Sequence, residues 1–294
     1  MRNILVVTGG AGFIGSNLIS EILKFKKFNI ISIDNYSSGL PKNHIKSKNI
    51  EYLKGNTKNI EILLKNYVSK IHTIFHFGEF ARIYQSFIKI NECFASNIEG
   101  SLNVFNFALK NKIRLIYSAT SASLGNNGND MNLSPYAFSK AKNIELLENL
   151  KKWFNFRYEI IYFYNVYGER QICKGEMATV VGIFEDCFNK GKKLPVVRPG
   201  TQVRRFTHVH DTVKACIFAW QKNKCKHYSI ASKQSFSIIK LAKLFKSKIK
   251  YLPIRKGERF VSSLTNMNLD NKIIRLSAKI RLKDYVNNFL MNNH

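Results

Sequence analysis

Tyr136 and Lys140 stand four residues apart and are of types that could together move a proton. If the segment Ser134 to Lys140 is helical, with Pro135 in its first turn, both side chains lie on one helix face. A tyrosine normally keeps its proton until about pH 10, but a neighbouring ammonium favours the phenolate and lowers the pKa. Tyr136 would then accept a proton from a substrate hydroxyl while hydride leaves the same carbon. The pair therefore indicates oxidation and reduction of an alcohol.

A glycine-rich loop, Thr8 to Gly15, follows a short apolar run and opens a segment with apolar residues at helical spacing. Gly9 suits the tight turn, Gly12 lets the backbone approach a pyrophosphate, and Gly15 permits close packing of helix on strand. The N-terminus of the helix adds free N–H groups and the positive end of its dipole. The loop therefore predicts a dinucleotide site.

Asp34 ends the next apolar run, about 20 residues beyond Gly15. A carboxylate at this place can accept hydrogen bonds from a ribose diol, and it would repel a 2′-phosphate. The cofactor predicted from these residues is therefore NAD rather than NADP.

The first half of the chain alternates short apolar runs with helix-like segments. We predict strands over 4–7, 30–33, 50–53, 72–75, 113–117 and 158–163, and helices over 13–25, 60–68, 91–109 and 135–153. This alternation indicates an α/β fold with a Rossmann-type, doubly wound parallel sheet.

The pattern changes after Gly168. We predict helices over 177–189, 212–221, 237–246 and 282–290, with extended pieces over 204–209 and 250–254. We expect an NAD-binding Rossmann domain over 1–168 and a smaller C-terminal substrate lobe over 169–294. Segments of this lobe are expected to return to the first domain.

The composition limits the class of protein. The chain has 294 residues, 45% of them hydrophobic, which is enough for a sizeable core. No apolar run reaches the roughly 18 residues of a membrane-spanning helix, and the N-terminal apolar stretch is too short for a signal peptide. Five cysteines without a C-x-x-C pair indicate reduced thiols and no metal site. We therefore expect a cytoplasmic protein without a membrane partner.

The net charge is unusual, at +28 from 47 Lys and Arg against 19 Asp and Glu. Such an excess can indicate nucleic acid or another polyanion. The lysines, however, are scattered over nearly every segment. We therefore interpret the charge as a solvated lysine-rich surface and do not expect nucleic acid as a partner.

These motifs together resemble the extended short-chain dehydrogenase/reductase family, and within it the nucleotide-sugar epimerases of the UDP-glucose 4-epimerase group. The resemblance covers nearly the whole chain. It rests on the glycine loop, Asp34-Asn35, Tyr136-x-x-x-Lys140, Tyr164 to Gly168, Arg204 to Val209, and Arg255-x-Gly257-Glu258.

The resemblance implies a tightly held NAD, a nucleotide-sugar substrate and a homodimer built on the helices that carry Asn97 and Tyr136. It implies oxidation at carbon 4 of a UDP-hexose or UDP-N-acetylhexosamine, a ketone that turns over in the pocket, and hydride return to its opposite face. Thr120 matches the family's third catalytic residue, so the implied catalytic set is Thr120, Tyr136 and Lys140.

The resemblance also implies binding residues for each ligand. For the cofactor these are Gly9, Gly12, Phe13, Ile14, Gly15, Asp34, Asn35, Asn56, Thr57, Phe77, Gly78, Asn97, Tyr136, Lys140 and Tyr164. For the substrate they are Arg82, Asn165, Arg204, Arg255 and Ser262. Arg204 and Arg255 match the arginines that grip the diphosphate, for which forked guanidinium groups are suited. Tyr164 is expected beside the nicotinamide.

The residues that follow Thr120 bear on the type of reaction, and Ser262 bears on the type of sugar. Related dehydratases and decarboxylases carry acids directly after the catalytic Thr, whereas Ser121 and Ala122 follow Thr120 here. This favours epimerisation, or simple oxidation and reduction. Ser262 stands where a bulky Tyr restricts relatives to plain hexoses, which favours N-acetylhexosamines.

Two alternative functions remain. The segment 174–178 resembles the ADP-heptose 6-epimerase branch, so another activated sugar is an alternative. Family positions usually held by Asp or Tyr are occupied by Asn56, Leu124, Arg205 and His210. These departures leave a divergent Rossmann protein with a binding role as the alternative from another class.

Overall fold

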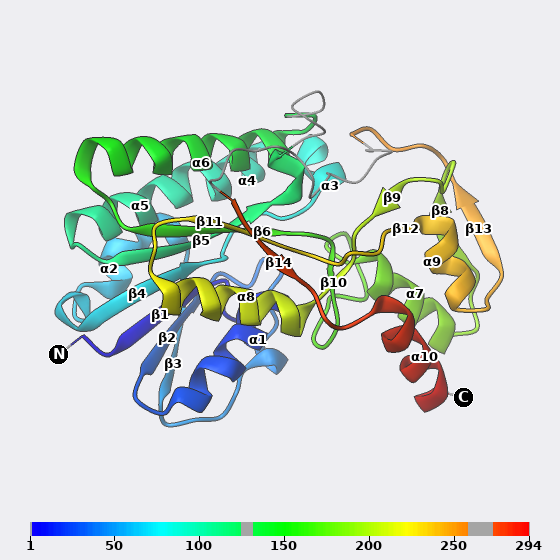
Figure 1. Cartoon of the computed structure of the whole chain (residues 1–294), viewed down its shortest axis with the longest axis horizontal. Helices are drawn as coiled ribbons and strands as arrows, with labels where there is room; N and C mark the ends of the chain where they lie inside the picture. The colour runs from blue at the N-terminus through cyan, green and yellow to red at the C-terminus, as the bar shows by residue number, and fades with distance from the viewer. Residues whose placement is uncertain (1, 125–131, 258–272, 294) are drawn as a thin grey trace.

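The computed structural model describes residues 2–124, 132–257 and 273–293. Within these residues an eight-stranded sheet runs in the order β14-β11-β6-β5-β4-β1-β2-β3, and its neighbouring strands pair in parallel. The strands are β1 (Ile4–Thr8), β2 (Asn29–Asp34), β3 (Ile50–Lys54), β4 (Ile71–His76), β5 (Arg114–Thr120), β6 (Tyr158–Phe163), β11 (His227–Ala231) and β14 (Ile273–Ser277). The predicted Rossmann-type α/β class is confirmed (Figure 1).

Helices cover both faces of the sheet, which is why central strands such as β1 are fully buried and nearly all apolar. One face packs under α2 (Ile60–Leu64), α5 (Ser101–Lys110) and α6 (Pro135–Phe154), and the other under α1 (Phe13–Ile22) and α8 (Val209–Lys222) (Figure 1). Successive residues of a strand serve opposite faces. In β5, Leu115 and Tyr117 join the first core and Ile116 joins the second.

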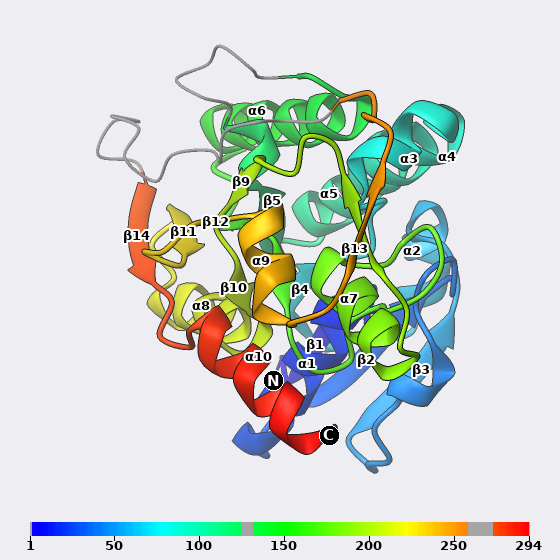
Figure 2. The same cartoon turned by 90° about the vertical axis from the view of Figure 1, so that its right-hand side faces the viewer.

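The C-terminal part builds a smaller lobe with its own core. It contains β8 (Leu194–Val197) paired in parallel with β13 (Ile249–Leu252), and the helices α7 (Val180–Asn189), α9 (Ile238–Leu244) and α10 (Leu282–Asn292). Phe184, Phe206 and Phe245 are fully buried at its centre. Figure 2 shows the elements of this lobe together, facing the viewer in front of the sheet.

Short ribbons join the lobe to the sheet region. β7 (Val166–Tyr167) pairs with β10 (Thr207–His208), and β9 (Val203–Arg204) pairs with β12 (Phe236–Ser237). β11 and β14, from the second half of the chain, extend the main sheet beyond β6. No helix of the described residues is both long and apolar enough to span a membrane.

Several predicted helices differ in their bounds from the observed ones; the helix predicted over 60–68, for example, ends at Leu64. The segment predicted as one helix over 91–109 contains α4 (Ile90–Phe94), a π-helical stretch (Ala95–Gly100) and α5. The helix predicted from residue 177 begins at Val180, because the Thr179 hydroxyl caps it by accepting the Gly182 N–H at 3.0 Å. The shorter helix leaves residues 177–179 as an irregular segment beside the cavity described below.

Asp211, in the first turn of α8, fixes the segment between β14 and α10. Its carboxylate is buried and accepts the backbone N–H groups of Lys279 and Ile280, both at 2.9 Å. Buried backbone N–H groups need such partners. Asp211 therefore attaches the end of the lobe to a helix of the main sheet.

We predict that Asp211→Ala lowers the free energy of unfolding by about 2 kcal/mol or more, because two amides lose their acceptor. Urea denaturation followed by circular dichroism measures the change. Asp284→Ala is the matched control: Asp284 forms a largely exposed ion pair with Arg281, so its loss should cost at most about 1 kcal/mol. Equal losses in the two variants would contradict this account of the attachment.

Candidate active site

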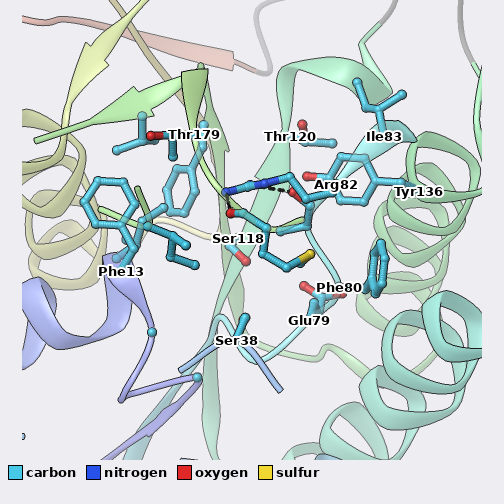
Figure 3. Close-up of a pocket in the computed structure, with 18 of the residues that line it drawn as sticks. Phe13, Ser38, Glu79, Phe80, Arg82, Ile83, Ser118, Thr120, Tyr136 and Thr179 are labelled. Carbon is cyan, nitrogen blue, oxygen red and sulfur yellow. Dashed lines mark hydrogen bonds between the residues drawn. The ribbon is translucent and has the colours of Figure 1, made fainter. Parts of the chain in front are cut away.

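A cavity of about 540 Å³ lies at the carboxyl ends of the sheet strands, between the sheet and the smaller lobe. In open parallel sheets this edge is where ligands bind. The sheet side contributes the loops after β1, β2, β4 and β5 together with the start of α6. The lobe side contributes residues from 172–183, 195–206 and 238–255 (Figure 3).

The glycine loop is packed so tightly that side chains would not fit. Gly9 has a φ of +70°, and a Cβ there would lie 2.9 Å from the backbone of Gly78 after β4. A Cβ on Gly15 would lie 2.1 Å from the Gly9 carbonyl oxygen. The predicted roles of a tight turn and of close helix–strand packing therefore have a geometric basis.

The N-terminus of α1 faces the cavity through Gly12 and Phe13. Gly12 is the N-cap residue and supplies no side-chain cap, and the first turn contains no acidic residue. The first turn of the helix therefore brings no carboxylate of its own to the positive end of the dipole, although the Asp34 carboxylate lies beside it at the Ala11 N–H. This arrangement suits an anionic ligand such as a pyrophosphate.

Asp34 lies at the end of β2, where it lines the cavity. Its two oxygens accept the N–H groups of Ala11 at 2.9 Å and Tyr36 at 2.8 Å. Burial raises the pKa of Asp34, and these backbone bonds act against that rise. Each oxygen keeps acceptor capacity for a ligand hydroxyl.

Tyr136 reaches the cavity from the first turn of α6. The Ser134 hydroxyl caps this helix by accepting the Ala137 N–H at 3.1 Å, and Pro135 occupies its first turn. Figure 3 shows the Tyr136 ring pointing into the cavity beside Thr120 from the end of β5. Burial raises the pKa of Tyr136 to about 12, and the hydrogen bond with Thr120 acts against this rise.

Lys140 lies one helical turn further along α6, as the spacing predicts. Its ammonium donates to the Ser118 carbonyl oxygen and forms a buried ion pair with Glu79. Burial lowers the pKa of Lys140, and the Glu79 carboxylate acts against that change. Sequence reasoning missed Glu79, although an acidic residue three positions after the end of an apolar strand was a visible signal.

Glu79 is held by several donors besides Lys140. One of its oxygens accepts the hydroxyls of Ser101 and Tyr117, both at 2.9 Å, and the Asn143 amide at 3.2 Å. Its side chain is only 2% exposed. These hydrogen bonds fix the Glu79 carboxylate in place.

Arg82 extends across the cavity from the loop before α3 (Ile83–Ile88). Its guanidinium donates to the backbone carbonyl oxygen of Ala81 at 2.8 Å, and to that of Met177 in the segment before α7. Its Nε is buried, and none of the described residues hydrogen-bonds to it. Arg82 thereby joins the sheet side of the cavity to the lobe side.

Most residues predicted for the site line this one cavity. They are Gly9, Gly12, Phe13, Ile14, Gly15, Asp34, Asn35, Asn56, Thr57, Phe77, Gly78, Arg82, Thr120, Tyr136, Lys140, Asn165, Arg204 and Arg255. Ser262 lies outside the described residues.

Two predicted cofactor residues do not line the cavity. Tyr164 is 1% exposed and packs in the core beneath α5 and α6, and its neighbour Phe163 faces the cavity instead, because successive residues of an extended chain point to opposite sides. Asn97 is fully buried and hydrogen-bonds the backbone of Phe80 and the hydroxyl of Ser139. The structure thus gives Asn97 a supporting place behind the site.

Two departures from the family pattern have structural partners of their own. The Asn56 side chain accepts the Lys58 N–H at 3.0 Å, so it caps a short helical turn at the rim of the cavity. The Arg205 guanidinium donates to the carbonyl oxygens of Ser232 and Lys233, at 2.8 and 2.9 Å. Arg205 therefore stabilises a loop, while its neighbour Arg204 lines the cavity.

The chain is similar to known proteins over nearly its whole length. It is 28% identical over 271 residues to the putative UDP-glucose 4-epimerase of Methanocaldococcus jannaschii, covering 87% of each chain. It is also 28% identical to the ADP-L-glycero-D-manno-heptose-6-epimerase of Brachyspira hyodysenteriae, covering 83% of this chain and 80% of that protein.

Solved structures and a family model agree with these likenesses. The crystal structure of UDP-glucose 4-epimerase from Thermotoga maritima, solved with UDP-glucose, superposes with a TM-score of 0.87 at 25% identity, covering 98% of this chain and 99% of that one. The family model described as NAD dependent epimerase/dehydratase matches residues 5–231. Cavity, glycine loop and sequence likeness lead to one conclusion: the chain belongs to the NAD dependent epimerase/dehydratase family.

Proposed function

We propose that the protein interconverts the carbon-4 epimers of a UDP-hexose or UDP-N-acetylhexosamine through a transient 4-keto sugar. The observation that carries this proposal is the meeting of Thr120, Tyr136 and Lys140 in the same cavity as the glycine loop and Asp34. A proton acceptor and a dinucleotide site then flank the same substrate carbon.

The residues of the cavity fit the NAD on which the family depends. The α1 N-terminus, without a side-chain cap, suits the pyrophosphate, and the Asp34 carboxylate suits the ribose diol. When bound, NAD supplies reversible redox chemistry by taking a hydride from the sugar carbon and returning it.

The chain's own residues handle the proton. Tyr136, as phenolate, accepts the proton of the substrate hydroxyl while the carbon is oxidised, and it returns that proton after the ketone has turned over. The Thr120 hydroxyl bonds the Tyr136 oxygen and holds it toward the substrate. Burial of Tyr136 excludes water, which would otherwise compete for the proton.

The diphosphate would bind on the lobe side of the cavity. Arg204 and Arg255 line that side, and Asn165, in the loop after β6, lines the cavity as well. Two guanidinium groups and an amide match the charge and the hydrogen-bond acceptors of a diphosphate. This places the sugar between the diphosphate and Tyr136.

The acid–base groups present favour epimerisation over elimination. Ser121 and Ala122 follow Thr120 and supply no acid. Glu79 lines the cavity, but its oxygens accept bonds from Lys140, Ser101, Tyr117 and Asn143. Because it is committed to these donors, Glu79 is unsuited to protonate a leaving hydroxyl.

An ADP-heptose 6-epimerase is the second candidate. The observation in its favour is the equal identity, 28%, to a 4-epimerase and to a heptose epimerase. Both reactions use the same redox step, so the choice between them depends on the sugar that the cavity accepts.

We predict that the purified protein converts UDP-glucose or UDP-N-acetylglucosamine into its galacto epimer, because Tyr136 and the NAD site flank one sugar carbon. Chromatographic separation of the nucleotide sugars measures this conversion. ADP-glycero-manno-heptose forms a parallel arm of the assay. Conversion of the heptose alone would move the assignment to the second candidate, and conversion of none of the three would refute both.

We predict that Tyr136→Phe lowers kcat by about a hundredfold or more, since it removes the group that carries the proton. The variant should still contain NAD, which release by denaturation and absorbance can quantify. Phe154→Tyr, at an exposed position at the far end of the same helix, is the control and should keep wild-type activity. Normal turnover in Tyr136→Phe would exclude it as the base.

We propose further that the protein forms a homodimer through α5 and α6. Leu102 on α5 and Phe138 on α6 are large apolar side chains, 41% and 38% exposed. Light scattering after gel filtration should give about twice 33.9 kDa. Leu102→Glu should shift the protein toward a monomer, whereas Ile62→Glu, at an exposed apolar position on α2, should not. A monomeric wild type would refute the proposal.

A further inference from the structure

The ammonium of Lys140 is not the isolated cation that its place beside Tyr136 suggests. It forms an ion pair with Glu79, and the two side chains are 4% and 2% exposed. A carboxylate bonded to a buried ammonium cancels most of the field of that ammonium at a third group. Lys140 therefore exerts little positive field on the Tyr136 phenol.

Arg82 is a cavity cation that forms no ion pair with any of the described residues. The groups that it bonds, the carbonyl oxygens of Ala81 and Met177, carry no net charge. Its buried Nε has no hydrogen-bond partner among the described residues. Figure 3 shows the Tyr136 hydroxyl directed toward the Arg82 side chain, and the two groups interact electrostatically.

We propose that Arg82 is the positioning residue whose charge stabilises the Tyr136 phenolate, because Glu79 neutralises the lysine of the Tyr-x-x-x-Lys pair. This proposal rests on the proposed function only in taking Tyr136 as the base. It divides between two residues the two roles expected of the lysine, which are to hold a ribose and to supply positive charge beside the tyrosine. Lys140 remains available to hold a ribose, and Arg82 supplies the field.

The directions in which neighbouring charges move the pKa of Tyr136 agree with these separate roles of Lys140 and Arg82. Apart from burial and the Thr120 hydrogen bond, the Glu79 charge raises the pKa of Tyr136 and the Arg82 charge lowers it. The reciprocal effect is present, since Tyr136 raises the pKa of Arg82 against the lowering caused by burial.

The other titratable groups packed around Tyr136 are uncharged near neutral pH. Burial raises the pKa of Cys93 to about 11 and that of Tyr117 well above its usual range. Burial lowers the pKa of His76 to about 4. The remaining charged side chains that act on the pKa of Tyr136 are therefore Glu79, which raises it, and Arg82, which lowers it.

The first test is Arg82→Gln. Loss of the cation should raise the pKa of Tyr136 by about one pH unit or more. The phenolate is the active form, so the acidic limb of the kcat/KM profile should move to higher pH by the same amount. At pH 7 this is about a tenfold loss of kcat/KM. Arg82→Lys keeps the charge and should hold the limb near its wild-type position.

A second measurement does not depend on turnover. The ultraviolet absorbance of tyrosinate is titrated in NAD-loaded protein without sugar, and the curve of Tyr136→Phe is subtracted from that of each variant. The midpoint for Tyr136 should rise in Arg82→Gln and stay in Arg82→Lys. If the protein epimerises none of the tested sugars, this titration still decides the proposal, so the two failures are distinguishable.

Glu79 gives the complementary variant. In the Arg82→Gln background, Glu79→Gln removes the negative charge that cancels the charge of Lys140. The titration midpoint of Tyr136 should then fall back toward the wild-type value. Arg204→Gln is the control for loss of any cavity arginine, and it should raise KM without moving the acidic limb.

The proposal would be overturned if Arg82→Gln changed neither the acidic limb of the kcat/KM profile nor the titration midpoint of Tyr136. It would also be overturned by an Arg82→Lys variant that behaves like Arg82→Gln, or by a double variant without any reversal. If Arg82→Gln instead raises KM for UDP-glucuronate alone and leaves the Tyr136 midpoint in place, Arg82 is a ligand of a substrate carboxylate and the proposal is wrong.

Discussion

The backbone at Gly9 is the point where three segments meet without room for a side chain. In the turn after β1, the carbonyl oxygen of Gly9 lies against Gly15 in α1. The backbone of Gly9 also lies against the backbone of Gly78 after β4. These contacts fix the start of α1 relative to β1, and they bring the end of β4 alongside. The chain then continues from Gly78 to Glu79 and Arg82, so the charges beside Tyr136 take their positions from the same contact. A substitution at any of the three glycines would displace the cofactor loop and these charged groups together.

Short-range signals account for the parts of the fold and site that the sequence could predict. Apolar runs identified the first six strands, and the spacings of Gly9, Gly12, Gly15, Tyr136 and Lys140 identified the loop and the helix pair. Each of these signals lies within one turn of a helix or one loop. For that reason they could be recognised before any tertiary contact was known.

Long-range contacts account for the parts that could not be predicted. Whether Phe163 or Tyr164 faces the cavity depends on the register of β6 beside β5, which a single strand does not encode. Glu79 matters because it meets Lys140, which lies 61 positions away in the sequence. Such a pairing becomes visible only when the end of β4 and the start of α6 are placed side by side. The same holds for Arg82 and Met177, which bond across the cavity.

The last segments of the chain have a consequence for biosynthesis. β14 is the edge strand of the main sheet, and it pairs with β11. Until residues 273–277 have left the ribosome, β11 presents an unpaired row of N–H and C=O groups to its surroundings, and Asp211 lacks the two amides that it binds. A nascent chain therefore has a nearly complete nucleotide-binding half with an open edge that invites association with other chains. Premature termination before residue 273 would leave that edge open for good.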